Sequence, residues 1–221
     1  MNTVLNILIV EDHPTMIEGY KSILSAKFKL DDEVIITTAF NCQMAYQKIS
    51  TAIVPYDIAL LDMIIPPFEA MKLYSGEELA LLIQQKMPHC KIIMSTSHTE
   101  AFVLYNLIKK ISPSGVLVKS DYNPEEFLLA IQKIREGEKY FSATAKLSIK
   151  EVHQENQYLD SYNRRIISLL AKGIKTKNLP QHLNITISAI DKRKAHIKEV
   201  FGIQKGTDED ILREAKHRGL I

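Results

Sequence analysis

The sequence predicts a doubly wound α/β domain with a five-stranded parallel sheet, followed by a small all-α domain. Two observations predict the first domain. Five short and almost wholly apolar runs recur between residues 6 and 118, and amphipathic segments with helical spacing separate them. Repeated strand–helix units of this kind form a parallel sheet covered on both faces. The second domain is predicted because the periodicity after residue 158 is helical throughout.

The five predicted strands are short and apolar enough to be buried on both faces. They cover residues 6–10, 34–39, 57–61, 91–94 and 115–118. Asn41 predicts the start of the second helix. Asn123, followed by Pro124 and two glutamates, predicts the start of the fifth helix, because Pro suits the first helical position and acids suit the first turn.

Length and charge agree with two domains of different kinds. A chain of 221 residues with 46% hydrophobic residues is long enough for two cores. Residues 1–150 contain 15 Lys and Arg against 17 Asp and Glu, a net charge of −2. Residues 151–221 contain 13 against 9, a net charge of +4. A basic second part suits contact with phosphates, although so small a charge is weak evidence by itself.

The N-terminal residues and the cysteines indicate the compartment. Charged Glu11 and Asp12 follow a short apolar run, which excludes a secretory signal or a membrane span there. We therefore expect a soluble cytoplasmic protein. Cys42 and Cys90 lack the spacing of metal ligands, and we interpret both as small buried side chains.

Chemically useful residues follow the predicted strands at one edge of the sheet. Glu11 and Asp12 come after the first strand, Asp62 after the third, Thr96 after the fourth and Lys119 after the fifth. Carboxylates supply the hard oxygens that Mg²⁺ prefers, and a carboxylate can attack phosphorus to form an acyl phosphate. A lysine and a hydroxyl can hold the remaining phosphoryl oxygens. The pattern favours phosphoryl acceptance at this edge.

These stretches, in this order, resemble the receiver domain of two-component response regulators over residues 5–136. The motifs that carry the resemblance are Ile9-Val10-Glu11-Asp12-His13-Pro14, Leu60-Leu61-Asp62-Met63 with Pro66, Thr96-Ser97-His98 and Val118-Lys119. Each residue alone is more often a turn, cap or solvated residue. Their ordered combination at successive strand ends outweighs that interpretation.

The resemblance implies a role for each residue. Asp62 is the expected phosphoacceptor, and a sensor histidine kinase is the expected donor. Mg²⁺ is expected at Glu11, Asp12, Asp62 and the backbone carbonyl of Ile64. Thr96 and Lys119 are the expected switch residues that contact the phosphoryl group. The domain is expected to act as a switch and not as an enzyme.

The sequence departs from the receiver pattern in several places. Glu11 replaces the commoner Asp, and Val116 stands where many relatives carry an aromatic that moves with the hydroxyl residue. Ile64 cannot form a hydrogen bond to a hydrolytic water, which predicts slow loss of phosphate. Residues 67–75 make the loop beside Asp62 longer than usual. That loop is either a tolerated surface insertion or a segment that shapes access to Asp62 or kinase recognition.

The remaining residues are divided into a linker and a helical domain. We assign residues 1–137 to the receiver, 138–157 to a linker with at most one short helix, and 158–221 to the helical domain. The stretch Leu159-Asp160-Ser161 caps a predicted helix that Gly173 ends, and a short helix covers 176–182. A third helix covers 189–201, so the last two form a helix-turn-helix. A final helix begins at the acid-rich residues 207–210 and either closes the small core or supports dimerisation.

This segment resembles the LuxR-type DNA-binding domain over residues 158–204, and the two resemblances together indicate the NarL/FixJ family. They rest on Leu159, Leu169-Leu170-Ala171-Lys172-Gly173, Leu183, Thr186, Ile190, Ile197 and Phe201-Gly202-Ile203. The resemblance implies a transcription regulator that binds double-stranded DNA, as a homodimer when active. The expected DNA-contacting residues are Thr186, Ser188, Lys192, Arg193, Lys194, His196 and Lys198.

Two departures keep other functions open. Pro180 stands where the family prefers Ala and predicts a shortened or kinked helix, and Asp191 stands where relatives often carry Lys. The helical domain could instead act through protein–protein contacts. A phosphatase with an Asp nucleophile is disfavoured, because the second acid it needs is replaced by Ile64. A phosphorylation-independent regulator is disfavoured by the intact Asp62, Thr96 and Lys119.

Overall fold

The computed structural model describes residues 4–28 and 33–221, and the chain divides into two compact units. One unit comprises Met1–His98 with Asn106–Ala145, and the other comprises Thr99–Tyr105 with Lys146–Ile221. Each unit has its own apolar core. Among the described residues, no helix combines the length and apolar character needed to cross a membrane.

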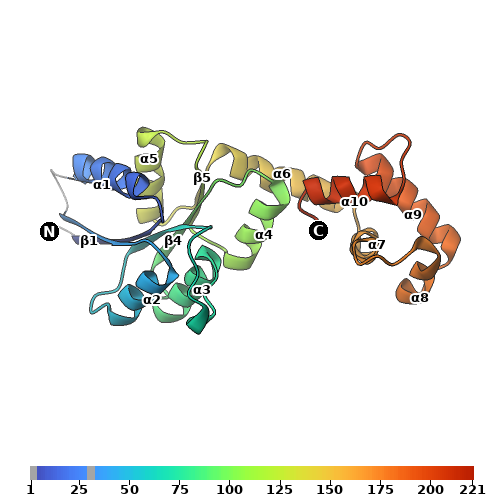
Figure 1. Cartoon of the computed structure of the whole chain (residues 1–221). Coiled ribbons are helices and arrows are strands. Elements are labelled where there is room, and N and C mark those ends of the chain that lie inside the picture. The colour runs from blue at the N-terminus through green and yellow to red at the C-terminus, as the bar shows by residue number, and fades with distance from the viewer. Residues whose placement is uncertain (1–3, 29–32) are drawn as a thin grey trace. The chain divides into compact units, whose positions relative to one another are not determined.

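The first unit is built around one parallel sheet (Figure 1). Its strands lie in the order β2-β1-β3-β4-β5-β6, and every neighbouring pair is parallel. The strands are β1 (Val4–Val10), β2 (Glu33–Ala39), β3 (Ile58–Asp62), β4 (Lys91–Thr96), β5 (Gly115–Val118) and β6 (Tyr140–Phe141). The first five confirm the predicted strands, with ends that differ by at most two residues.

The prediction of five strands was one too few. β6 pairs with β5 in the segment that was interpreted as a linker, and Tyr140 donates its backbone N–H to Ser114 at 3.0 Å. A 16-residue helix, α6 (Ala143–Tyr158), follows where at most a short helix was expected. A strand of two residues shows no alternation in the sequence. Its position is decided by backbone hydrogen bonds to a neighbouring strand.

Helices cover both faces of the sheet (Figure 1). They are α1 (Pro14–Phe28), α2 (Cys42–Thr51), α3 (Gly76–Lys86), α4 (Ala101–Ile111) and α5 (Pro124–Arg135), with a 3₁₀ turn η1 (Glu69–Met71) before α3. α1 and α5 pack on one face, where the Tyr20 and Phe127 rings stack at 4.9 Å. The predicted caps are confirmed: Asn41 accepts from the Met44 N–H, and Asn123 forms a capping box with Glu126.

The second unit is helical, as predicted. Its elements after α6 are α7 (Ser161–Ala171), the 3₁₀ turn η2 (Thr176–Asn178), α8 (Leu179–Leu183), α9 (Ile187–Val200) and α10 (Asp208–His217). Asp160 caps α7, and Gly173 ends it with a φ of 78°. Pro180 shortens the first helix of the helix-turn-helix, α8, as predicted. This helix begins at Leu179, just before Pro180. Pro has no backbone N–H, and in the first turn of a helix that N–H has no partner within the helix, so no hydrogen bond is lost. α9 begins two residues earlier than expected, capped by Thr186.

Two glycines make a matched stability test. A Cβ added to Gly76 would lie 2.0 Å from the carbonyl oxygen of Asp62, whereas one added to Gly19 in α1 meets nothing within 4 Å. We expect Gly76→Ala to lower the free energy of unfolding by about 1–3 kcal/mol through overpacking. Gly19→Ala should raise it by about 0.5–1 kcal/mol through helix propensity. Urea titrations measure both, and equal effects would contradict the close approach of Gly76 to Asp62.

Candidate functional site

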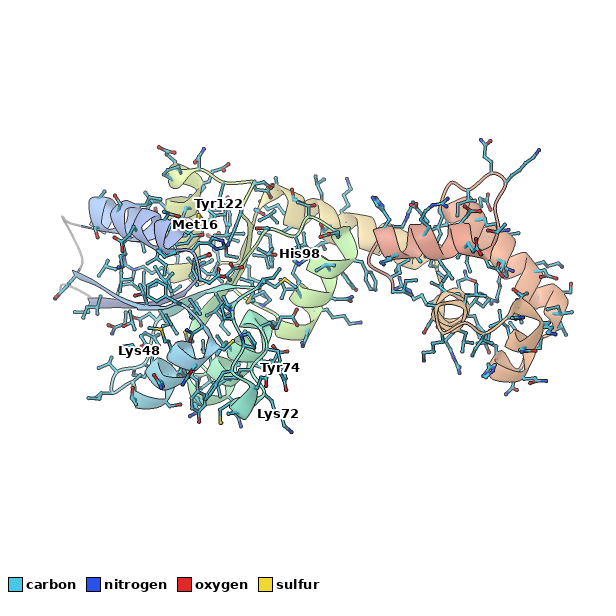
Figure 2. All side chains as sticks on the ribbon, in the orientation of Figure 1. Met16, Lys48, Lys72, Tyr74, His98 and Tyr122 are labelled. Atoms are coloured by element: carbon cyan, nitrogen blue, oxygen red, sulfur yellow. The ribbon has the colours of Figure 1, made fainter. Side chains whose placement is uncertain are left out.

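The carboxyl ends of four neighbouring strands bring the predicted site residues together. Glu11 directly follows β1, Asp62 ends β3, Thr96 ends β4 and Lys119 directly follows β5. These strands are adjacent in the order β1-β3-β4-β5. His98 lies in the loop after β4 and Tyr122 in the loop after β5 (Figure 2). The predicted convergence at one edge is therefore present.

Lys119 joins two buried carboxylates. Its Nζ donates a hydrogen bond to Asp62 Oδ2 at 2.7 Å and lies 2.9 Å from Glu11 Oε2. The Asp62 and Glu11 side chains are only 6% and 2% exposed. We call these three residues the Lys119 triad. Two carboxylates this close repel each other, so the ammonium is the group that permits both to be buried.

Burial and charge shift the pKa values of the triad in different directions. Burial raises the pKa of Asp62, and the nearby Glu11 carboxylate adds to the rise, against the opposing hydrogen bond from Lys119. Burial also opposes ionisation of Glu11, but the Lys119 ammonium and the His13 hydrogen bond outweigh it and lower its pKa. Burial disfavours the Lys119 ammonium, yet the hydrogen bond to Asp62 and the ion pair with Glu11 raise its pKa. The site therefore keeps a charged lysine beside an acid whose negative charge is costly.

Next to the triad lies an acidic cluster with unused oxygens. Ligand atoms of Glu11, Asp12, His13 and Asp62 all lie within 4.8 Å of one another. Glu11 Oε2 and Asp12 Oδ1 are buried without a hydrogen-bond partner, since the Lys119 contact to Glu11 is an ion pair that lacks hydrogen-bond geometry. Buried acceptors without partners are costly. These oxygens suit a hard divalent cation, which would satisfy both.

His13 contacts both acids of the cluster, a feature that the sequence did not reveal. Its Nδ1 lies 2.9 Å from Glu11 Oε1 and 2.7 Å from Asp12 Oδ1. The Glu11 hydrogen bond and the Asp12 charge raise the pKa of His13. The imidazole is two-thirds exposed, so water reaches the His13 ring.

Ile64 and Thr96 lie at the rim and floor of the site. The Ile64 backbone N–H donates to Asp62 Oδ1 at 3.3 Å, and its side chain is largely exposed. Thr96 is fully buried. Its hydroxyl lies 3.5 Å from Met63 Sδ and accepts the His98 N–H at 3.0 Å. In this structure the Thr96 hydroxyl thus contacts Met63 and His98.

The long loop beside Asp62 has a defined local structure. Phe68 and Leu73 pair as an antiparallel bridge that closes η1, and Lys72 takes a left-handed φ of 55°. The Phe68 ring lies 5.9 Å from that of Tyr46 in α2. Figure 2 shows Lys72 and Tyr74 projecting from this loop before α3. The role suggested for the loop in access or recognition stays a prediction.

Two other features of this unit escaped the sequence analysis. Val116 is buried in β5. The hydroxyl of Tyr20 in α1 forms a hydrogen bond of 2.7 Å with the hydroxyl of Tyr122 in the loop after β5. Asp121 in the same loop binds Thr144 at the start of α6. The sequence did contain a signal for this second contact. Ser142 stands directly before the helix and Thr144 lies in its first turn, and both residue types are typical of a helix start.

The structure divides the predicted DNA-contacting residues into two groups. Thr186, Ser188 and Lys192 are exposed on α9 or its cap, and His196 is half-buried, 3.6 Å from Glu199. The other three make bonds within the helical unit. These bonds run from Arg193 to Asp160 and Asn163, from Lys194 to Thr176 and Asp208, and from Lys198 to the Gly206 carbonyl.

Comparison with known proteins decides the family. The response regulator receiver domain model matches residues 7–132, more than half of the chain. Oxygen regulatory protein NreC of Staphylococcus aureus strain JH9 is 26% identical over 212 residues, covering 90% of this chain and 92% of NreC. The chain belongs to the response regulators that carry this receiver domain.

Solved structures agree on the fold of this response regulator. A structure of two RcsB dimers bound to two parallel DNAs matches with a TM-score of 0.66 at 17% identity, covering 98% of this chain and 99% of that one. RcsB of Salmonella typhimurium matches at 0.63 and 18% identity, with coverage of 98% and 99%. A LuxR-family regulator from Aurantimonas sp. SI85-9A1 matches at 0.55 and 24% identity, covering 68% of this chain and 98% of that one.

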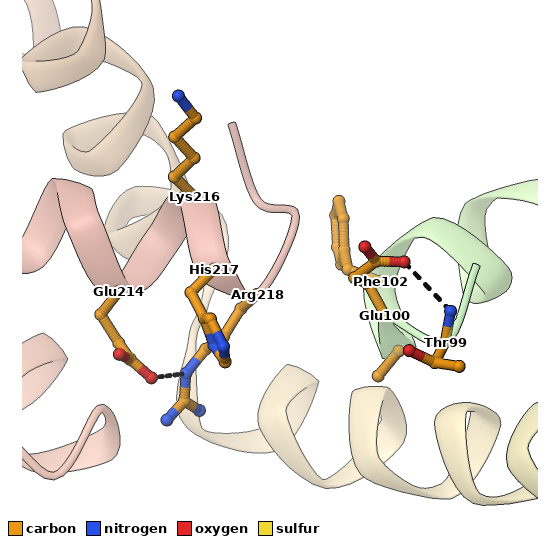
Figure 3. A pocket seen from close by; sticks show the side chains of 8 residues that line it. Thr99, Glu100, Phe102, Glu214, Lys216, His217 and Arg218 are labelled. Carbon is orange, nitrogen blue, oxygen red and sulfur yellow. Dashed lines mark hydrogen bonds and ion pairs between the residues drawn. The ribbon is translucent and has the colours of Figure 1, made fainter. Parts of the chain in front are cut away.

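The last helix of the response regulator ends in local ion pairs. Arg218 donates to Glu214 at 2.7 Å, one turn earlier in α10 (Figure 3). Figure 3 also shows the Glu100 carboxylate accepting the Thr99 N–H at 3.1 Å, at the start of α4. Both contacts are short-range and complete helix ends.

The Lys194–Asp208 pair predicts a pH-dependent contribution to stability. Burial opposes ionisation of Asp208, but hydrogen bonds from Lys194 and Thr176 outweigh it and lower its pKa below 3.8. A lowered acid pKa stabilises the folded state above the unfolded pKa, and that stability is lost as the pH falls through the folded pKa. We expect Asp208→Asn to lower the free energy of unfolding by about 0.5–1 kcal/mol at neutral pH, because the pair is partly exposed.

The same substitution should have little effect at a pH below the folded pKa of Asp208. Denaturant titrations at the two pH values measure this difference. Glu209→Gln, which changes an exposed neighbouring acid of α10, serves as the control. An effect of Asp208→Asn that is independent of pH would contradict the ion-pair explanation.

Proposed function

We propose that this response regulator accepts a phosphoryl group on Asp62 from a sensor histidine kinase. Once phosphorylated, it binds double-stranded DNA as a homodimer and regulates transcription in the cytoplasm. The observation that carries the first half is the Lys119 ammonium, which holds buried Asp62 beside the unsatisfied oxygens of Glu11 and Asp12. The chain serves as a phosphoryl acceptor and switch, and no enzymatic turnover of a separate substrate is proposed.

The residues of the site divide the chemistry among them. An Asp62 carboxylate oxygen attacks the phosphorus of phosphohistidine, and the P–N bond breaks with its electrons going to the imidazole. Glu11, Asp12, Asp62 and the Ile64 carbonyl would hold Mg²⁺, which supplies neutralising charge to the phosphoryl oxygens. Lys119 turns from the Asp62 carboxylate to the new phosphoryl oxygens. Thr96 gives up its contact with Met63 to donate there as well.

The helical unit supplies the DNA-binding half of the proposal. Lys172, Lys175 and Lys177 are exposed in and before the turn that joins α7 to α8, and Lys192 is exposed on α9. Exposed lysines flanking a helix-turn-helix suit phosphate contacts. The DNA-bound RcsB dimers of similar fold support this half. Within the proposal, residues 1–137 form the receiver, and the DNA-binding domain covers 158–221, with α6 spanning most of the segment between them.

A second candidate function has its own supporting observation. Arg193, Lys194 and Lys198 form bonds inside the helical unit, which leaves α9 less basic than its sequence indicates. Such a domain could act through protein–protein contacts. Salt dependence distinguishes the two functions, because DNA binding through phosphates weakens steeply as salt rises.

The deciding experiment is enrichment from a pool of random duplex DNA. Wild type and Asp62→Ala are compared, each with and without a small phosphodonor plus Mg²⁺. We expect the donor to increase selective enrichment by wild type and to leave Asp62→Ala unchanged, because only wild type can form the acyl phosphate. Enrichment by neither protein in any condition would contradict DNA binding and favour a protein partner. Mass spectrometry of the same samples tests phosphorylation separately.

Removal of the lysines around the α7–α8 turn should weaken DNA binding without changing the selected sequence. For a variant with Lys172, Lys175 and Lys177 all changed to Gln, we expect the slope of log K against log salt to become shallower by about 0.9 for each lost phosphate contact. Lys216→Gln, which removes one exposed charge from α10, is the control for a loss of charge elsewhere in the helical unit. An unchanged slope would remove these lysines from the interface.

Phosphate on Asp62 should be lost slowly because Ile64 offers no hydrogen bond to an attacking water. An Asn at this exposed position can orient that water. We expect Ile64→Asn to accelerate dephosphorylation by about tenfold, the effect of one hydrogen bond of about 1.4 kcal/mol in the transition state. Phosphate release is followed after removal of the donor. A rate equal to wild type would refute the idea, and Ile64→Leu controls for the loss of branching.

A further inference from the structure

The face of α9 that reaches solvent has an unusual composition for a DNA-contacting helix. Its exposed or partly exposed residues on one side are Ile187, Ser188, Asp191, Lys192 and Ala195, which we call the reading face. Spacings of four residues place Ile187, Asp191 and Ala195 in one row and Ser188 and Lys192 in the next. One acid and one base leave this face with no net charge, and Ile187 is 46% exposed at its N-terminal end.

The other cations of α9 are held away from the reading face. Arg193 donates to Asp160 at 2.6 Å, and its guanidinium also lies 4.8 Å above the Tyr162 ring. Lys194 donates to Thr176, and Lys198 donates to the Gly206 carbonyl at 2.6 Å. These contacts strengthen the packing of α9 on its neighbours. They leave Asp191 and Lys192, together with Glu199 near the end of the helix, as the exposed charged groups of α9.

This arrangement assigns a base-reading role to an acid. Resting on the proposed DNA binding, we propose that Asp191 accepts a hydrogen bond from the exocyclic amino group of a cytosine in the major groove, and that Ile187 packs on the methyl group of a nearby thymine. Phosphates and the acceptor edge of guanine repel a carboxylate. Adenine presents an amino donor beside the N7 acceptor, so a carboxylate meets one favourable and one unfavourable group there. Cytosine presents the donor alone.

The position of Asp191 along α9 agrees with this role. It lies one turn after Ile187, and the N-terminal residues of a recognition helix are those that contact base edges. The exposed lysines Lys172, Lys175 and Lys177 around the α7–α8 turn supply the attraction that the neutral reading face lacks. Affinity thus comes from the turn and sequence preference from α9.

The test is selection of bound sequences from a random duplex pool by phosphodonor-treated protein, for wild type, Asp191→Asn and Glu199→Gln. Glu199 continues the row of Asp191 but lies two turns beyond it, near the end of α9, so its substitution removes the same charge far from the N-terminal residues that contact bases. In wild type we expect one position with a cytosine preference. In Asp191→Asn that position should change to adenine, because an amide matches the N6 and N7 groups of adenine.

We expect the cytosine preference at that position to fall by about fivefold or more in Asp191→Asn, the usual size of one base contact. Glu199→Gln should select the wild-type sequence. If wild type and Asp191→Asn select the same sequence, the base-reading role of Asp191 is wrong, while DNA binding stands. If wild type selects no sequence with or without the donor, the proposed DNA-binding function itself is wrong.

A separate set of contacts connects the phosphoacceptor site to the helix that continues toward the second unit. Lys119 binds Asp62 through its side chain, and its backbone N–H donates to the Thr96 carbonyl at 2.7 Å. Two residues later, the Asp121 carboxylate accepts the Thr144 N–H at 2.8 Å and the Thr144 hydroxyl at 2.7 Å. Asp121 therefore caps the first turn of α6 from another part of the chain.

A buried hydroxyl strengthens this connection. Ser142, the residue before α6, accepts the Val118 N–H at 3.1 Å through its side chain and donates its own N–H to the Val116 carbonyl. The end of β5, the Lys119–Asp121 turn and the start of α6 thus share one hydrogen-bond network. We infer that Asp121 is a positioning residue that couples the phosphoryl contact of Lys119 to the first turn of α6.

Hydrogen exchange measures this coupling without any need for DNA. In wild type, phosphorylation should change the exchange rate of amides in the first turn of α6. In Asp121→Ala, exchange there should be fast and insensitive to the donor, although Asp62 is phosphorylated to the wild-type level. Ser120→Ala, an exposed neighbour in the same turn, should behave as wild type.

Two outcomes would overturn the inference. The first is an unchanged exchange rate at α6 in phosphorylated wild type. The second is a full response to the donor in Asp121→Ala. Asp121→Asn keeps an acceptor oxygen for the Thr144 N–H but removes the negative charge. It should restore part of the exchange response that Asp121→Ala loses, which distinguishes the effect of the helix cap from the effect of the charge. Failure of wild type to accept phosphate would instead contradict the proposed function of Asp62.

Discussion

The placement of one ammonium among buried carboxylates is the constraint on which the receiver site depends. Lys119 lies within 3 Å of both Asp62 and Glu11, and neither acid could keep its charge in so buried a place without it. The parallel sheet makes this possible, because adjacent strands end at one edge and deliver each side chain from a rigid element. The carboxylates repel one another, and a bound divalent cation would lower that repulsion.

The same edge explains why a local event can reach a distant part of the chain. The turn that carries Lys119 continues directly into Asp121, and Asp121 holds the start of α6. Only Ser120 separates Lys119 from Asp121. The inferred coupling therefore passes from the group that Lys119 binds to the Asp121 cap through one short turn of backbone. Helix caps are sensitive points, since each cap contributes about 1 kcal/mol to a helix end. The usual aromatic on β5 is absent here, and this polar route does not require it.

In the helical unit, intramolecular ion pairs reduce the number of basic side chains of α9 that are available to bind DNA. The sequence of α9 contains a run of basic residues, yet Arg193 and Lys194 bind acids of the same unit. Their partners Asp160 and Asp208 lie far away in sequence and cannot be recognised as partners by spacing. The charged residues that remain exposed on α9 are Asp191, Lys192 and Glu199, while exposed lysines lie around the turn before α8. Phosphate contact and base reading are thus assigned to different segments.

The sequence by itself determined the fold class, five of the six strands, the helix caps at Asn41, Asn123 and Asp160, and the residues at the strand ends. These features are local, because periodicity, capping and turn chemistry act within a few residues. Only the tertiary structure decided β6, the Asp121 cap of α6 and the pairing of the α9 cations. Each of these joins residues through space, where a hydrogen bond or ion pair forms because the fold brings the groups within 3 Å. Local sequence patterns contain no record of such distances.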